Sequence, residues 1–190
     1  MKIKDYLKDI VRCAEHLQLQ SSTIDEIIKM LLECRESEHK VFICGNGGSA
    51  GTATHMAGDL FKIAGIKAIS LDDNVPLMTA IINDNGWENL YVDQLKRLMN
   101  HGDILVAISV HGGSGKDKAG KWSQNLMKAI QYSNENLGKT VGFSGFDGGA
   151  MKKECDVCIV VPSNSTPVVE SFHVVLEHLI TFALQEGDRK

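Results

Sequence analysis

The chain has 190 residues, of which 43% are hydrophobic and 23% charged, and its formal net charge is −4. This composition is typical of one soluble globular domain, and the acidic balance excludes the basic surface with which proteins bind nucleic acid. No apolar run approaches the ~20 residues of a membrane-spanning helix, and the N-terminus lacks the apolar core of a signal peptide. We therefore expect a cytoplasmic protein without a nucleic-acid or membrane partner.

Two amphipathic helices are predicted before the first strand. The first covers residues 2–20, and its apolar face consists of Tyr6, Ile10, Cys13 and Leu17. Capping signals at Ser22 and Thr23 predict the start of the second helix. Within a single domain, residues 1–38 would form an N-terminal helical pair and residues 39–190 an α/β core. Such a pair is compatible with oligomerisation, although helices that cover their own subunit's sheet would have the same pattern.

Strands and helices then alternate along the chain. Strands are predicted at residues 41–44, 67–70, 103–109, 140–143 and 157–161. Helices are predicted between them at residues 50–61, 78–82, 88–99 and 122–133, and a last helix opens at Pro167 and runs to about residue 185. Strands separated by helices pair in parallel through right-handed crossovers. The fold class is therefore α/β, with a five-stranded parallel doubly wound sheet.

The cysteines are odd in number and scattered. They are Cys13, Cys34, Cys44, Cys155 and Cys158. The last two form a C-x-x-C pair at the start of a strand, but no second pair completes a zinc site. We expect reduced thiols, as in cytosolic proteins.

The first predicted strand ends in the glycine loop Gly45-Asn46-Gly47-Gly48-Ser49, which opens a helix. A helix N-terminus offers free backbone N–H groups to an anion, and glycines let a ligand approach the backbone closely. The spacing fits neither the dinucleotide fingerprint nor the P-loop. We therefore predict a sugar phosphate as ligand, and the alternative is a turn that needs glycine only for its geometry.

Two further loops are predicted at the same edge of the sheet, where ligands of doubly wound folds bind. Residues 82–87 include Asp84, and residues 109–115 place His111 in a glycine-rich stretch.

Four side chains with nitrogen or oxygen donors lie on two of the predicted helices. His55 and Asp59 share a helix face because they are four residues apart. Glu170 and His178 are two turns apart on the C-terminal helix and can address one site. Together the four could bind zinc or a similar divalent metal, or could act as acids and bases without a metal. The alternative is that they belong to solvated helix faces.

The segment 44–50, with His55 and Asp59 downstream, resembles the sugar isomerase (SIS) domain and, within it, the bacterial phosphoheptose isomerases. Segments 83–87, 102–109, 143–149 and 170–178 extend this resemblance over essentially the whole chain. The resemblance implies a flavodoxin-like five-stranded core in a homotetramer, with active sites at subunit interfaces. It also implies conversion of sedoheptulose 7-phosphate to D-glycero-D-manno-heptose 7-phosphate through an enediol, for lipopolysaccharide or capsule synthesis.

The resemblance further implies roles for individual residues. By resemblance, Ser49, Asp84, Ser109 and Ser114 would bind the substrate. From their places in the same loops and on the last helix, we add Asn46, Gly47, Gly48, His111 and Glu170 to the predicted substrate-binding residues. The zinc ligands would be His55, Asp59, Glu170 and His178. Asp59 and His178 would also be the acid/base pair, and the two roles compete for them.

The chain differs from the family pattern at five places, which include Pro167, where an acidic residue is expected, and a stretch at residues 116–122 that looks longer than typical. The family usually has Glu at the position of Asp59, Gln at that of Glu170, and a hydroxyl-rich phosphate loop at residues 109–114. These differences leave the fold and the sugar-phosphate class in place and open two alternatives. One is an SIS isomerase for a different phosphosugar or sugar derivative, and the other is a non-enzymatic SIS regulator that binds the replication initiator DnaA.

Overall fold

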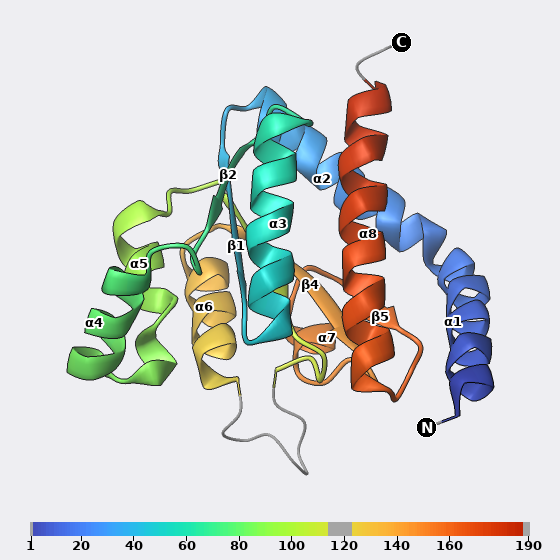
Figure 1. Ribbon diagram of the computed structural model, residues 1–190. Helices are drawn as coiled ribbons and strands as arrows, with labels where there is room; N and C mark the ends of the chain where they lie inside the picture. The colour runs from blue at the N-terminus through green and yellow to red at the C-terminus, as the bar shows by residue number, and fades with distance from the viewer. Residues whose placement is uncertain (1, 114–122, 188–190) are drawn as a thin grey trace.

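The computed structural model describes residues 2–113 and 123–187 (Figure 1). The strands are β1 (Lys40–Gly45), β2 (Lys67–Ser70), β3 (Ile104–Ile108), β4 (Lys139–Gly145) and β5 (Val157–Val161). The α-helices are α1 (Ile3–Leu17), α2 (Ser21–Glu36), α3 (Gly48–Lys62), α4 (Val75–Asn85), α5 (Val92–Leu98), α6 (Gln124–Glu135), α7 (Met151–Glu154) and α8 (Thr166–Gly187). Two short 3-10 helices, η1 (Gln18–Gln20) and η2 (Trp87–Asn89), complete the elements.

The strands form one parallel sheet in the order β2-β1-β3-β4-β5, which confirms the predicted fold class. Strand β2 lies on one side of β1, and β3, β4 and β5 follow on the other side. The direction in which strands are added therefore reverses between β1 and β3, and this is the switch point of the sheet. Their last residues, Gly45 and Ile108, are paired in the register. The loops that follow these two strands therefore start side by side, where ligands of doubly wound sheets bind.

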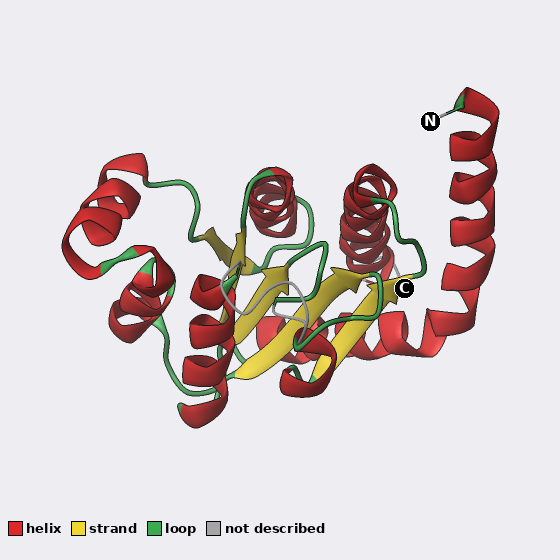
Figure 2. Ribbon diagram, turned by 90° about the horizontal axis from the view of Figure 1, so that it is seen from below, coloured by secondary structure: helices red, strands yellow, loops and turns green. Residues whose placement is uncertain are grey.

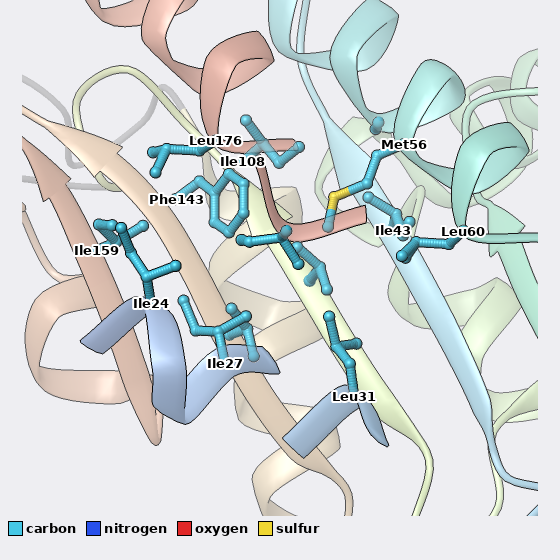
Figure 3. Close-up of a cluster of buried hydrophobic side chains, with 14 of the residues drawn as sticks. Ile24, Ile27, Leu31, Ile43, Met56, Leu60, Ile108, Phe143, Ile159 and Leu176 are labelled. Carbon is cyan, nitrogen blue, oxygen red and sulfur yellow. The ribbon is translucent and has the colours of Figure 1, made fainter. Parts of the chain in front are cut away.

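The helices cover the sheet from both faces because successive strand side chains point to opposite sides. Val41 and Ile43 of β1 pack in a cluster with α1, α2, α3 and α8. Phe42 and Cys44 pack in a second cluster with α5, α6 and α7. Figure 3 shows the first cluster, in which Ile24, Ile27 and Leu31 of α2 lie on the same face of the sheet as Met56, Leu60 and Leu176.

Helices α3 and α8 lie next to each other on one face of the sheet (Figure 1). Residues Thr166–Glu186 of α8 are long and apolar enough to span a membrane, but half of them are buried inside the protein. A core helix of a soluble domain has the same composition, so this helix does not indicate a membrane protein.

Helix α1 lies at one side of the molecule, beyond α8 (Figure 2). Its predicted apolar face is confirmed: Cys13 and Leu17 are buried, and Tyr6 and Ile10 pack against the same cluster. Three apolar side chains on α1, Ile3, Leu7 and Val11, remain exposed.

Two local predictions were wrong, and one helix was missed. Neither Ser22 nor Thr23 caps α2, because η1 joins α1 directly to α2 and Gln20 is the residue before its first turn. The helix predicted at residues 88–99 is divided into η2 and α5. Helix α7 was not predicted, since four residues are too few to show a helical period.

Candidate active site

A cavity of about 240 Å³ lies where the loops after β1 and β3 meet the start of α8. Polar residues from both loops and from α8 line it: Asn46, Ser49, Ser109, His111, Ser123, Thr166 and Glu170. Five of these, Asn46, Ser49, Ser109, His111 and Glu170, were predicted from the sequence to bind substrate. The fold therefore brings together side chains that are up to 124 positions apart, at the edge where a ligand was expected.

The glycine loop needs two of its glycines for geometry. Gly47 has a φ of 59°, a left-handed conformation that turns the chain into α3. A Cβ on Gly45 would lie 2.5 Å from the carbonyl carbon and oxygen of Ser49, so a larger residue would collide with backbone. The close turn places Ser49 in the first turn of α3, beside the cavity. The hydroxyl and the N-terminal turn of the helix together suit an anionic group.

The loop after β3 is held by hydrogen bonds within the loop and to β4. The Ser109 hydroxyl accepts from the amide of Gly113 at 3.1 Å, and the Ser109 amide donates to the carbonyl of Phe143 at 2.9 Å. The ring of His111 lies against Phe146 with the ring centroids 4.3 Å apart. These contacts give the cavity a preformed wall.

Glu170 lies at the glycine loop. It belongs to the second turn of α8, and a Cβ built on Gly48 would be 2.6 Å from its Oε1 atom. The absence of a side chain at Gly48 therefore makes room for the Glu170 carboxylate at the edge of the cavity.

A second polar group lies between α3 and α8. It consists of His55, Asp59, Glu177 and His178, which each offer one ligand atom within 4.8 Å of the others. Asp59 Oδ2 is 3.6 Å from His55 Nε2 and 4.0 Å from His178 Nε2. Glu177 Oε2 is 3.3 Å from His178 Nε2 and 3.9 Å from His55 Nδ1.

Glu177 is the unusual member of this group. Its side chain is 0% exposed, and neither carboxylate oxygen has a hydrogen-bond partner among the described residues. Burial, and then the charge of Asp59 beside it, raise the pKa of Glu177 to about 7. A buried carboxylate is costly unless a proton or a cation compensates it. Two imidazoles and two carboxylates are a donor set that suits zinc, so these residues fit the predicted metal.

Glu170 is not part of this group, although the sequence placed it there as a zinc ligand. Gly48 meets Glu170 and His55 meets Glu177, so α3 and α8 run in the same direction at matching depths. Eight residues separate Glu170 from His178, which is ~12 Å along a helix. The two share a helix face, as predicted, and in this structure the Glu170 carboxylate lies at the glycine loop while His178 lies with His55 and Asp59.

Glu177 was not predicted from the sequence, yet α8 contains a signal for it. The buried side chains of this helix include Phe172, His173, Leu176, Ile180 and Leu184. Glu177 falls within that apolar stripe, where a charged residue is not expected without a partner.

The remaining predicted site residues lie elsewhere. Asp84 is exposed on α4, where it accepts a hydrogen bond from the Asn83 side chain, and it does not line the cavity. Gly47 and Gly48 shape the loop without lining the cavity. Ser114 lies outside the described residues.

Comparison with known proteins agrees with this arrangement. The family profile described as SIS domain matches residues 5–117, which include the glycine loop and the strand that leads to the serine-lined cavity. The chain belongs to the SIS domain family, as the sequence motifs predicted.

Its relatives within that family are phosphoheptose isomerases. The chain is 33% identical over 183 residues to the phosphoheptose isomerase of Aliarcobacter butzleri, with 94% of this chain and 92% of the relative covered. It is 34% identical over 182 residues to that of Helicobacter pylori strain P12, with 91% and 90% covered. The solved structure of the phosphoheptose isomerase GmhA from Neisseria gonorrhoeae has a TM-score of 0.85 and 25% identity, over 97% of both chains.

Proposed function

We propose that this protein is a phosphoheptose isomerase that converts sedoheptulose 7-phosphate to D-glycero-D-manno-heptose 7-phosphate. The observation that carries this proposal is the similarity to phosphoheptose isomerases over almost the whole chain. The reaction is a ketose–aldose isomerisation, in which a proton moves between adjacent carbons through an enediol. We place it in the cytoplasm, in the supply of heptose for lipopolysaccharide or capsule.

In this proposal the cavity binds the sugar phosphate. Ser49, Ser109 and the first turn of α3 offer hydroxyl and backbone N–H donors for the phosphate, and Ser114 would add another hydroxyl. Asn46 and Glu170 border the same space and would hydrogen-bond sugar hydroxyl groups. Asp84, which is exposed on α4, has no part in this binding scheme.

The proton transfers are assigned to Asp59 and His178. Both side chains are accessible, with 21% and 46% of their surfaces exposed, and Asp59 Oδ2 lies 4.0 Å from His178 Nε2. A carboxylate and an imidazole are suitable to take a proton from one carbon and return one to its neighbour. Zinc, which we propose would be held by His55, Asp59, Glu177 and His178, would supply a Lewis acid that stabilises the enediol oxyanion.

We further propose a homotetramer whose active sites are completed between subunits. Within one chain the His55 group and the cavity lie at different depths of the α3–α8 pair, since Glu170 borders the cavity and Glu177 the histidines. The exposed apolar side chains Val175, Leu179 and Phe182 surround His178 on α8. A contact between subunits would cover this surface and could bring the His55 group of one subunit to the cavity of another.

The test is to incubate the purified protein with sedoheptulose 7-phosphate, with and without added zinc, and to follow the aldose by NMR. We expect product, and more of it with zinc. Failure to form product in either sample, from a folded protein, would contradict the proposal. A panel of other phosphosugars would then identify a sibling isomerase, and failure with all of them would leave the DnaA-binding regulator to be tested by pull-down.

A further inference from the structure

A network of polar side chains, two of them buried and one partly buried, lies behind the glycine loop, on the far side of β1 from the His55 group. Its members are Asp72 after β2, Tyr91 before α5, and Asn125 in α6. The Tyr91 side chain is 1% exposed and that of Asn125 is 0% exposed. None of the three lines the cavity, and the proposed reaction gives none of them a role.

Asp72 and Tyr91 hold both polar groups of the Gly45 backbone. The Gly45 amide donates to Asp72 Oδ2 at 3.0 Å, and the Tyr91 hydroxyl contacts the Gly45 carbonyl. The same hydroxyl is 2.8 Å from Asp72 Oδ1. Gly45 is the last residue of β1, so these bonds fix the peptide from which the glycine loop starts.

Asn125 fixes the next residue. The side-chain amides of Asn46 and Asn125 pair reciprocally, at 3.1 Å and 2.8 Å. The amide of Leu126 donates to Asn125 Oδ1 at 2.9 Å, and this determines which way both side-chain amides face. Asn46 itself lines the cavity, so the network reaches the ligand through one residue.

The protons in this network can be counted. The Tyr91 hydroxyl has one proton, but the Gly45 carbonyl, Asp72 Oδ1 and, at 3.3 Å, Asn46 Oδ1 all lie within hydrogen-bond distance of it. If Asp72 is ionised, only one of these contacts can be a hydrogen bond. If Asp72 carries a proton, it donates to Tyr91 and Tyr91 donates to the Gly45 carbonyl, so both of these contacts are hydrogen bonds, while Asn46 Oδ1 accepts from Asn125. Burial raises the pKa of Asp72 to about 6, against the lowering effect of the hydrogen bonds from Tyr91 and Gly45, so the protonated form predominates below about pH 6.

The other titratable groups near the pair are Cys44 and Asp73. Burial raises the pKa of the Cys44 thiol and of the Tyr91 phenol well above their ordinary values, so both stay neutral. The charge of Asp73 further favours the protonated form of Asp72.

We propose that Asp72 and Tyr91 are positioning residues, which form a carboxylic acid–phenol pair that holds the Gly45–Asn46 peptide in place for the sugar phosphate. The pair holds the loop most firmly when Asp72 is protonated. This inference rests on the proposed function, because it takes the glycine loop as the substrate site.

Two variants test the pair. Asp72→Asn imitates the protonated acid, because its carbonyl can accept from Gly45 while its NH₂ group donates to Tyr91. Tyr91→Phe keeps the ring and removes the hydroxyl. We expect Tyr91→Phe to raise KM about five-fold with a smaller effect on kcat, because it weakens substrate binding rather than the chemical step. We expect Asp72→Asn to match the wild type at about pH 5 and to have a KM several-fold lower at about pH 8.

The quantity to compare is the KM of the wild type divided by the KM of Asp72→Asn. In this ratio the effects of ionising the substrate phosphate and all other groups cancel, because both proteins share them. A ratio that is the same at both pH values would overturn the proposal. So would a Tyr91→Phe variant with unchanged KM and only a lower Tm, since that would show a structural role alone.

A second readout separates this inference from the proposed function. In protein labelled with ¹⁵N-glycine, the Gly45 amide signal of the wild type should titrate with a midpoint near pH 6, and that of Asp72→Asn should not. If the wild type has no isomerase activity, the proposed function fails while this titration still decides the pair. The same titration in both proteins, or in neither, would refute it.

Discussion

Glu177 shows at the scale of a residue how a side chain can be structurally costly and chemically useful. It is buried, its carboxylate oxygens have no hydrogen-bond partner among the described residues, and two histidines lie within 4 Å of it. A cation between these groups would compensate the carboxylate and would use the histidines as further ligands. The same burial makes Glu177 a better candidate ligand than Glu170, which lies at the glycine loop.

Zinc affinity distinguishes the two glutamates. We expect Glu177→Gln to weaken zinc binding at least about ten-fold in calorimetry, because it removes one of two anionic donors. Glu170→Gln is the matched control, from the same helix and with the same change of charge, and it should bind zinc like the wild type. The reverse result would restore Glu170 as the ligand.

Stability of the metal-free protein should depend on Glu177 in a defined pH range. The pKa of this group is raised from 4.5 to about 7 in the fold, so the folded state keeps a proton that the unfolded chain has released. Stability therefore falls as pH rises from about 4.5 to about 7, by on the order of 2 kcal/mol. Urea unfolding at about pH 5 and pH 8 should show this loss for the wild type but a smaller one for Glu177→Gln. An equal loss of stability in the wild type and in Glu177→Gln would show that other titratable groups cause it.

Single residues were predictable where the signal is local. Asn46 and Ser49 lie in the short turn from a strand into a helix, so their place in the cavity follows from the sequence. The position of Glu177 beside His55 depends on how α8 is aligned along α3, and no local sequence pattern shows that alignment. Ser109 was partly predictable. The central strand that it follows showed at which edge of the sheet it lies, but not that its side chain lines the cavity.

At the scale of elements, the turn from β1 into α3 positions the residues of the cavity. Gly47 and Gly48 are adjacent but serve different purposes. Gly47 has the left-handed φ, and a Cβ added there would have nothing within 4 Å, whereas Gly48 faces the Glu170 carboxylate.

The two glycines should therefore respond differently to alanine. Gly47→Ala should destabilise the fold by about 1–2 kcal/mol, because alanine is strained at that φ. Gly48→Ala should change stability little, since the end of a flexible side chain can move, but it should raise KM by displacing Glu170 from the cavity edge. Thermal unfolding and steady-state kinetics on both variants would check this, and the opposite assignment of effects would contradict it.

Most elements could be predicted because continuous apolar runs mark the strands, and helices separate one strand from the next. The capping of α2 could not, because that helix continues from α1 through η1 and has no free start to cap. The strand ends shifted by one or two residues, which does not change the edge where the site lies.

At the scale of the whole molecule, exposed apolar surface on α8 supports assembly. Leu179 is 48% exposed and adjoins His178, half of whose side chain is also exposed. Solvent-exposed apolar side chains that adjoin a polar site commonly mark a contact surface. The sequence predicted a tetramer only through family resemblance, because periodicity cannot tell a subunit interface from a face that covers its own sheet.

Leu179→Glu should therefore produce a smaller species in light scattering and should lose isomerase activity. Zinc binding should persist in this variant, because the four candidate ligands are unchanged, and this control excludes local damage. Leu137→Glu, an exposed leucine between α6 and β4 that is 66% accessible, should retain both size and activity. A fully active monomer of Leu179→Glu would show that one chain contains the whole active site.

The pairing of α3 with α8 also restricts how the chain can change in length. Gly48 and His55 are seven residues apart, and so are their partners Glu170 and Glu177. An insertion in a surface loop leaves both pairs intact. A single residue inserted between the two positions on either helix would rotate one pair by ~100° relative to the other and shift it by ~1.5 Å. The same seven-residue spacing must therefore be kept in two segments that are distant in sequence. Homologous chains should gain or lose residues only outside the segments 48–55 and 170–177.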